Sequence, residues 1–251
     1  MKALRDTYIL FKRSMKHITR SPDTIITVAV MPIAFMLLFV YVFGGAIHSG
    51  ANNYVNYLLP GILIIAIASG VSYTAFRLFT DMQKGIVSRL KSMPIKRSSV
   101  LWSHVLTSIV SNVISVAIII AVAFLMGFRS QANLFEWLGV IGILLLFLFG
   151  LTWLAVIPGL KAKTIDGASA FSYPLILLPF VSSAFVPTST MPTPVRVFAE
   201  NQPVTAIVNA VRSLLDSKPV GNDLWMALIW CVVITLIAYF FAVRIYKKST
   251  I

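Results

Sequence analysis

Charged side chains are scarce in this 251-residue chain. They make up 12% of the residues, whereas a soluble globular domain carries about a quarter. Hydrophobic residues account for 58%, and the mean hydropathy is +0.89. A chain this apolar has too few polar groups to cover a water-soluble fold, so the composition predicts an integral membrane protein.

The chain has one cysteine, no carboxylate in the middle of an apolar run and no catalytic motif. The single cysteine, Cys231, excludes a disulfide framework, and the histidines are not spaced as ligands, so we expect no metal site and no catalytic residues. Glu136 and Asp166 lie at the ends of apolar runs, which argues against an ion-coupled carrier. No G-x-x-x-x-G-K-[ST] loop occurs, so we expect no ATP and no other cofactor on this chain.

Six apolar runs are each long enough to cross about 30 Å of hydrocarbon. They predict six transmembrane helices, at residues 24–46, 57–79, 99–127, 136–158, 168–187 and 224–243. No signal-cleavage pattern follows the first run, so we expect it to be retained. Of the 21 Lys and Arg residues, 17 lie on one side of these spans and four on the other. The positive-inside rule then places both termini in the cytoplasm of a bacterial-type cell, at the plasma membrane, and the charge of +13 needs no nucleic acid as partner.

The N-terminal segment, residues 1–20, mixes apolar and basic side chains. Its apolar residues recur at alternating spacings of four and three from Leu4 to Ile18, which predicts an amphipathic helix. Such a helix can lie on an anionic membrane surface, so membrane lipids are expected partners. Packing on the inner face of the protein itself would satisfy the same pattern.

Residues 80–97 form the longest polar stretch between two long apolar runs. Thr80 followed by Gln83 predicts a helix start, and Pro94 predicts the end of a helix of about three turns. One apolar stripe on this helix would be formed by Met82, Ile86, Leu90 and Met93. We interpret the stretch as a cytoplasmic loop that faces a partner protein; a solvated basic loop is the equally weighted alternative.

The loop expected at residues 188–223 is long and rich in proline. Pro203 suits the first position of a helix, and the stripe from Val204 to Leu215 needs apolar surroundings. From these residues alone, a helix at the outer membrane boundary is slightly favoured over one that dips between other helices. Arg212 is expected to pair with Asp216 at four-residue spacing, with Val208 buried and Asn209 accessible.

Polar side chains inside the expected spans are candidates for contact with a transported compound. They include Ser72, Tyr73, Asn112, Ser182 and Ser183. Polar residues within membranes more often bond neighbouring helices, so that structural role stands beside the possible lining of a path.

Two stretches carry the most specific patterns. Lys84 to Arg97 is similar to G-x3-R-L-x3-P-I-x-R, and a second pattern runs from Ser182-Ser183-Ala184-Phe185-Val186-Pro187 through Met191-Pro192 to Asn201-Gln202-Pro203 and Arg212. With the six spans, these patterns resemble the permease subunit of type-2 ABC exporters, in their daunorubicin-resistance-like branch. The resemblance covers nearly the whole chain. Gln83 and Lys84 depart from it, because many relatives carry an acidic or arginine residue there.

The resemblance implies one all-α membrane domain over residues 1–251, with six transmembrane helices, an N-terminal amphipathic helix, a cytoplasmic coupling helix within 80–97 and a re-entrant helical hairpin within 188–223. The coupling surface would comprise Met82, Gly85, Ile86, Arg89, Leu90, Met93 and Pro94, and the outer gate Pro187, Pro192, Pro203, Val208 and Arg212.

The resemblance further implies an ATP-driven exporter of an amphipathic drug, lipid or similar compound. Two permeases, identical or paralogous, would work with two cytoplasmic ABC ATPase subunits, and ATP and magnesium would bind to those partners. A channel or a non-transporting membrane scaffold is the alternative, followed by a membrane-embedded enzyme.

Overall fold

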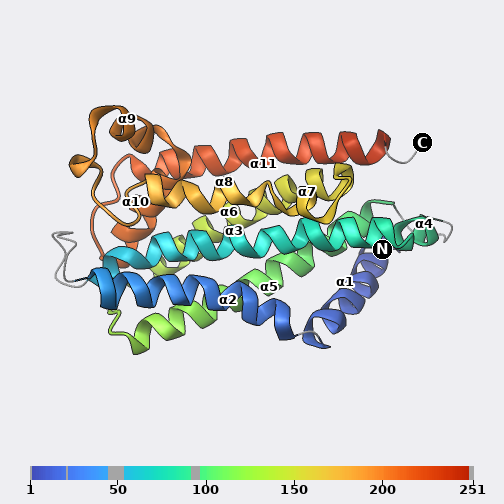
Figure 1. Cartoon of the computed structure of the whole chain (residues 1–251), viewed down its shortest axis with the longest axis horizontal. Helices are drawn as coiled ribbons and strands as arrows, with labels where there is room; N and C mark the ends of the chain where they lie inside the picture. Colours follow the sequence, from blue (N-terminus) through green and yellow to red (C-terminus); the bar gives the residue numbers. More distant parts are fainter. Residues whose placement is uncertain (1, 21, 45–53, 92–96, 249–251) are drawn as a thin grey trace.

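Long helices lying side by side dominate the structure (Figure 1). The computed structural model describes residues 2–20, 22–44, 54–91 and 97–248, and every regular element in these ranges is a helix. Four helices are long and apolar enough to cross a membrane, namely α3 (Tyr54–Gln83), α5 (Arg97–Leu125), α6 (Leu134–Lys161) and α11 (Asp223–Lys248). The all-α prediction is confirmed for the described residues, and four of the six expected spans are continuous helices.

The first expected span is a helix that changes its winding. α2 (Pro22–Leu37) continues without a break into η1 (Leu38–Phe43), which is π-helical. The centre of the Phe39 ring in η1 lies 4.6 Å from the centre of the Phe185 ring. Aromatic packing therefore joins the first apolar run to the end of the fifth.

The fifth expected span is divided into short pieces. They are α7 (Ile165–Ser169), α8 (Ser172–Leu177) and the 3-10 turn η2 (Leu178–Val181). Pro174 and Pro179 contribute to this division, because proline has no N–H to donate and its ring clashes with the preceding turn. Helix is lost altogether at Ser182, whose backbone is extended.

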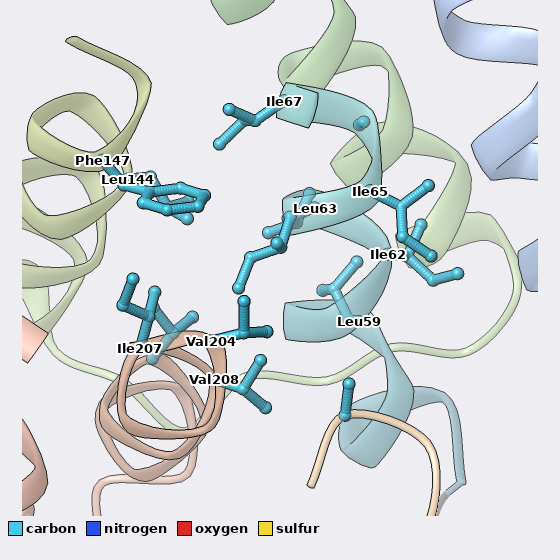
Figure 2. Close-up of a cluster of buried hydrophobic side chains, with 14 of the residues drawn as sticks. Leu59, Ile62, Leu63, Ile65, Ile67, Leu144, Phe147, Val204, Ile207 and Val208 are labelled. Atoms are coloured by element: carbon cyan, nitrogen blue, oxygen red, sulfur yellow. The ribbon is translucent and has the colours of Figure 1, made fainter. Parts of the chain in front are cut away.

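α3 is the central helix of the bundle. In its most apolar 18-residue window 83% of the residues are buried, against 22% in α11. It contacts α2, α5, α6, α8 and α10. Figure 2 shows Leu59 and Leu63 on the side of α3 that faces Val204 and Val208 of α10. α3 therefore connects both ends of the molecule through the core.

Further helices lie at the two ends of the bundle. One end carries η3 (Thr188–Thr190), α9 (Thr193–Asn201) and α10 (Pro203–Leu215), and we name it the α10 end (Figure 1). The opposite end carries α1 (Lys2–Arg20) and α4 (Ile86–Lys91), and we name it the α4 end.

α1 packs along α5 at the α4 end. Leu10 is buried together with Val87 of α4 and Val100 of α5, so packing on the protein's own surface accounts for part of the amphipathic pattern. Leu4 and Tyr8 remain 78% and 62% exposed. One face of α1 therefore stays available to lipid.

Candidate functional site

The apolar stripe of α10 is buried as the sequence predicted. Pro203 occupies the start of the helix, and Val204, Ile207, Val208 and Val211 have almost no exposed surface. α10 contacts α3, α6 and α11, so protein side chains supply the apolar surroundings that the stripe requires.

Gln202 links the turn between α9 and α10 to the fifth apolar run, which is broken into short helices. Its side-chain amide donates to the carbonyl of Leu178 at 3.3 Å and to the carbonyl of Val181. These carbonyls belong to the first and last residues of η2, directly before regular helix stops. Of the prolines expected at the gate, Pro187 is half-buried and Pro192 is exposed.

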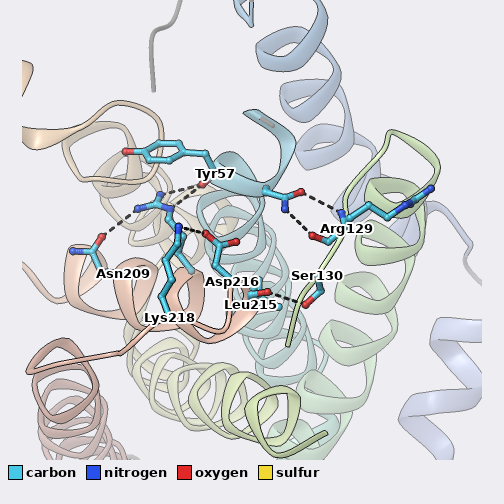
Figure 3. Close-up of polar contacts among 9 residues, drawn as sticks. Tyr57, Arg129, Ser130, Asn209, Leu215, Asp216 and Lys218 are labelled. Carbon is cyan, nitrogen blue, oxygen red and sulfur yellow. Dashed lines mark hydrogen bonds and ion pairs between the residues drawn. The ribbon is translucent and has the colours of Figure 1, made fainter. Parts of the chain in front are cut away.

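Arg212 is the centre of a polar cluster at the α10 end. Its Nη2 donates to the carbonyls of Tyr57 at 3.0 Å and Ser183 at 2.8 Å, and its Nη1 donates to Oδ1 of Asn209 at 3.2 Å. Figure 3 shows Tyr57 and Asn209 of this cluster. The guanidinium carbon also lies 3.8 Å from the centre of the Tyr57 ring, a cation–π contact. Burial lowers the pKa of Arg212, although an arginine still carries its proton at neutral pH.

The expected pairing of Arg212 with Asp216 is wrong. Asp216 instead accepts from Lys218 Nζ at 2.9 Å (Figure 3). The four-residue spacing is correct for a helix, but the guanidinium turns into the bundle, where several carbonyl oxygens converge on it. Asn209 was expected to be accessible, yet its side chain is half-buried and accepts from both Arg212 and Ser183.

The irregular segment after η2 is fastened to the first turns of α3. Tyr57 Oη donates to the carbonyl of Ser183 at 2.9 Å, and Tyr54 Oη donates to that of Phe185 at 3.2 Å. A Cβ added to Gly61 would lie 2.6 Å from Cβ of Ala184, so only glycine permits this close approach. Non-helical backbone at this position is satisfied by protein groups, as a low-dielectric environment requires.

Three of the five polar residues proposed to line a path form hydrogen bonds within the protein. Asn112 is buried on α5 and donates to the carbonyl of Ser108 at 2.9 Å, and its Oδ1 has no hydrogen-bond partner in the described residues. Ser182 Oγ donates to the carbonyl of Pro179, and Ser183 Oγ donates to Asn209. Ser72 and Tyr73 are half-buried. The hydrogen bonds of Asn112, Ser182 and Ser183 are those expected for a structural role, and the path-lining role of the five residues stays a prediction.

Hydroxyl groups also connect three long helices in the core. Thr74 Oγ1 of α3 donates to Ser108 Oγ of α5 at 2.6 Å, and Ser108 Oγ lies 3.4 Å from Thr152 Oγ1 of α6. Sequence reasoning missed this connection, because which of many hydroxyls meet depends on how the helices pack.

An apolar cavity was also missed. It measures about 230 Å³, lies between α3, α5 and α6, and is lined by Ile67, Val116, Trp137 and other apolar side chains. Nothing in the sequence separates these residues from ordinary core positions.

The coupling loop differs from the predicted single helix. α3 continues through Thr80 to Gln83, and Thr80 Oγ1 donates backwards to the carbonyl of Phe76 at 2.9 Å instead of capping a new helix. Gly85 then adopts a φ of +66° and separates α3 from the short α4. Few residues other than glycine take this left-handed conformation without strain, which explains the break.

α4 turns an apolar side chain inward and a basic one outward. Val87 is 1% exposed against Leu10 and Val100, and Met82, which is partly buried, packs against the same group. Arg89 is exposed, and Ile86 lines a polar cavity. Of the other expected coupling residues, Leu90 lies in α4 without a described side chain, while Met93 and Pro94 lie outside the described residues.

Comparison with known proteins decides the family. Residues 5–215 match the family model of the ABC-2 type transporter. The chain belongs to the ABC-2 type transporter family. It is therefore a membrane transport component rather than an enzyme, as the resemblance predicted.

Several named relatives of this ABC-2 chain are drug-resistance permeases. It is 28% identical over 243 residues to the daunorubicin resistance ABC transporter permease protein DrrB1 of Streptomyces coeruleorubidus, covering 94% of this chain and 84% of that protein. It is 23% identical to the probable doxorubicin resistance permease protein DrrC of Mycobacterium tuberculosis, covering 89% and 82%. It is 27% identical to the putative transport permease ycf38 of Cyanophora paradoxa, covering 84% and 74%.

Proposed function

We propose that the chain is the permease subunit of an ATP-driven exporter and that a separate ABC ATPase binds at α4. The observation that carries this proposal is the course of α3. One unbroken helix of 30 residues, about 45 Å long, runs from the Arg212 cluster to the turn at Gly85 that precedes α4. A displacement of α4 can thus reach the α10 end through a single rigid element.

The proposed cycle uses the two ends of α3 in sequence. ATP and magnesium bound between the ATPase partners would draw two permease copies together through their α4 helices. α3 would then shift against α10 and the segment from Ser182 to Phe185, and opening there would release the transported compound. Arrangements that differ by such helix shifts are a general way of switching a membrane path between its two sides.

The proposed topology has six crossings with both termini in the cytoplasm. The four long helices supply four crossings, α2 with η1 supplies the first, and the broken run from α7 to η2 supplies the fifth. The α4 end then faces the cytoplasm, and α9 and α10 form a re-entrant hairpin in the outer leaflet of the plasma membrane.

The proposed cargo is an amphipathic drug, lipid or similar compound. The relatives' names supply the drug class, and the apolar cavity between α3, α5 and α6 offers space for an apolar group. A second copy of this chain, or a paralogue, is the proposed permease partner, with membrane lipids surrounding the pair.

A charge reversal on α4 tests the ATPase docking site. The permease is co-expressed with an ABC ATPase chosen as its candidate partner, and the amount of ATPase that co-purifies is measured. Arg89→Glu changes the exposed side of α4 and leaves the buried Val87 in place, so recovery of the ATPase should fall by about tenfold or more. Lys163→Glu, an exposed lysine in the loop after α6, is the matched control and should matter little.

Two outcomes would contradict the docking proposal. Unchanged recovery with Arg89→Glu would remove α4 from the interface, and wild-type permease that recovers no ATPase under any condition would remove the partnership itself. Correct membrane insertion of each variant is checked by its elution profile in detergent.

Cysteine labelling tests the proposed topology. In a Cys231→Ala background, single cysteines replace the exposed Ser189 of η3 and the exposed Lys163. A membrane-impermeant thiol reagent added to intact cells should label position 189 and spare position 163. The reverse pattern would invert the orientation and place α4 outside, where no ATPase could reach it.

A further inference from the structure

A polar cavity of about 280 Å³ lies at the α4 end, between α1, α3 and α5. Three cationic side chains line it, Arg13 from α1, Arg77 from α3 and Lys84 from the turn that follows α3. The carboxylate in the lining is that of Asp81. The cavity therefore carries an excess of positive charge and suits an anion.

Arg77 has a hydrogen-bonding group that the described residues leave unused. Its Nε donates to the carbonyl of Tyr73 at 3.3 Å, but its Nη1 is buried and has no partner among the described residues. A buried donor without an acceptor is costly, and such donors are rare in folded proteins. The missing acceptor can be supplied by a bound anion in the adjoining cavity after a small shift of the side chain.

Asp81 is engaged with a different group. Its Oδ2 lies 3.5 Å from Nε2 of His104, which is 7% exposed on α5. Thr80 and Thr107 also line the cavity, but their hydroxyls already donate to the carbonyls of Phe76 and Ser103. The donors that the cavity offers are therefore cationic, and its one carboxylate already faces a histidine.

The surroundings of the cavity are apolar on one side. Phe76 lines the cavity itself, and Ile9, which is 55% exposed, lies one helical turn before Arg13 on the same side of α1. An anion bound here would have apolar surface beside it. A phosphate attached to acyl chains fits this combination better than a free ion does.

The position along α3 agrees with the depth of a lipid headgroup. Arg77 follows Tyr54 by 23 residues, which corresponds to about 35 Å of helix rise. The hydrocarbon core of a bilayer is about 30 Å thick. With Tyr54 at one boundary, Arg77 lies at the level of the phosphate groups of the opposite leaflet.

We propose that this cavity binds the phosphate group of an anionic phospholipid. Arg77 supplies the buried guanidinium, and Arg13 and Lys84 supply further positive charge at the rim. Arginine and lysine bind phosphate through charge-assisted hydrogen bonds, which are stronger than neutral ones. The bound headgroup would bridge α1 to α3 directly before the turn into α4.

The test measures how anionic lipid changes the melting temperature of the purified chain. Phosphatidylglycerol is titrated into detergent-solubilised protein, and phosphatidylcholine serves as the zwitterionic reference. The melting temperature should rise with the first lipid and much less with the second. Arg77→Gln should weaken the apparent affinity for phosphatidylglycerol by about tenfold.

Two further variants separate binding from folding. The double variant Arg13→Gln, Lys84→Gln leaves the buried Arg77 in place and should also weaken the response, because it removes two cations from exposed positions. Asp81→Asn removes the carboxylate and should tighten binding, a gain that a merely damaged fold would not produce. Arg196→Gln, on exposed α9 at the opposite end, is the matched control and should leave the response unchanged.

Specific results would overturn the proposal. If glycerol phosphate without lipid stabilises the chain as strongly as phosphatidylglycerol does, the site takes a soluble anion. If Arg77→Gln and the double variant both respond like the wild type, the cavity holds only water. Equal stabilisation by phosphatidylcholine would show that the effect comes from acyl chains and not from the charged headgroup.

Discussion

The two ends of α3 hold a buried cation in different ways. At the α10 end, Arg212 donates to the carbonyls of Tyr57 and Ser183 and covers an aromatic ring. At the α4 end, Arg77 uses its Nε, while its Nη1 has no partner in the described residues. One end is thus complete within the chain, whereas the other has room and donors for a group from outside.

This difference has a mechanical meaning for the proposed transport cycle. A polar cluster satisfied by neutral carbonyls is costly to open, because separation leaves several buried groups without partners. An incomplete cluster can accept or release a ligand without that cost. We therefore expect opening of the α10 end to need energy supplied by the ATPase, and the α4 end to respond to what binds there.

Removing Arg212 should have the largest effect on stability. Arg212→Met removes the guanidinium hydrogen bonds to the carbonyls of Tyr57 and Ser183, at about 1.5 to 3 kcal/mol for each bond to a charged donor, although the Ser183 carbonyl still accepts from Tyr57 Oη. Thermal or denaturant unfolding in detergent should show a large loss. Arg77→Met is the matched variant at the other end, and it should lose clearly less stability because fewer acceptors depend on it. Equal losses would remove the distinction between the two ends.

Filling the close contact at Gly61 should have the next largest effect. Gly61→Ala puts a methyl group 2.6 Å from Cβ of Ala184, and overpacking of this kind costs about 1 to 3 kcal/mol. Gly142→Ala is the control, because no atom lies within 4 Å of the added carbon. A lowered melting temperature for the first variant alone would show that close packing stabilises the α10 end in addition to the polar cluster.

The hydroxyl contact between α3 and α5 should contribute less. Thr74→Val keeps the shape of the side chain and removes the donor to Ser108 Oγ, with an expected loss of about 0.6 kcal/mol. Ser115→Ala is the comparison, since Ser115 Oγ bonds to the carbonyl of Ser111 in its own helix. If both variants unfold alike, the contact between helices adds nothing beyond bonding within one helix.

The smallest effect is expected for the surface pair beside the Arg212 cluster. Lys218→Gln removes an ion pair in which the lysine side chain is 67% exposed, so the free energy of unfolding should change by less than about 0.5 kcal/mol. Denaturant unfolding at low and high salt checks this value. A loss as large as that of Arg212→Met would mean that Lys218 supports the buried cluster.

Sequence patterns predicted the features that depend on local spacing. Pro203 begins α10 and the stripe after it is buried, because a 3.6-residue period determines which side chains share a face. The helical content of the long apolar runs follows from the same period and from the need to satisfy backbone groups in a membrane.

Features that depend on distant parts of the chain were predicted incorrectly or not at all. The acceptor for Arg212 at Tyr57 lies 155 residues away in the sequence, so a local four-residue rule chose Asp216 instead. Thr80 fits a capping pattern, but α3 is already helical when it reaches Thr80, and the hydroxyl bonds back to Phe76. The unused Nη1 of Arg77 can be recognised only when the atoms around it are known.

A change of winding in the π-helical stretch η1 would rotate one part of the first apolar run relative to the other. A π-helical turn holds an extra residue, and in an α-helix each residue advances by about 100° around the axis. Rewinding η1 as α-helix would therefore turn Phe39 relative to Phe35, which lies before it in α2. Phe39 would leave its contact with Phe185, while Phe35 could keep its edge-to-face contact with Phe180. A change of winding within η1 would thus alter the contact between the first apolar run and the end of the fifth.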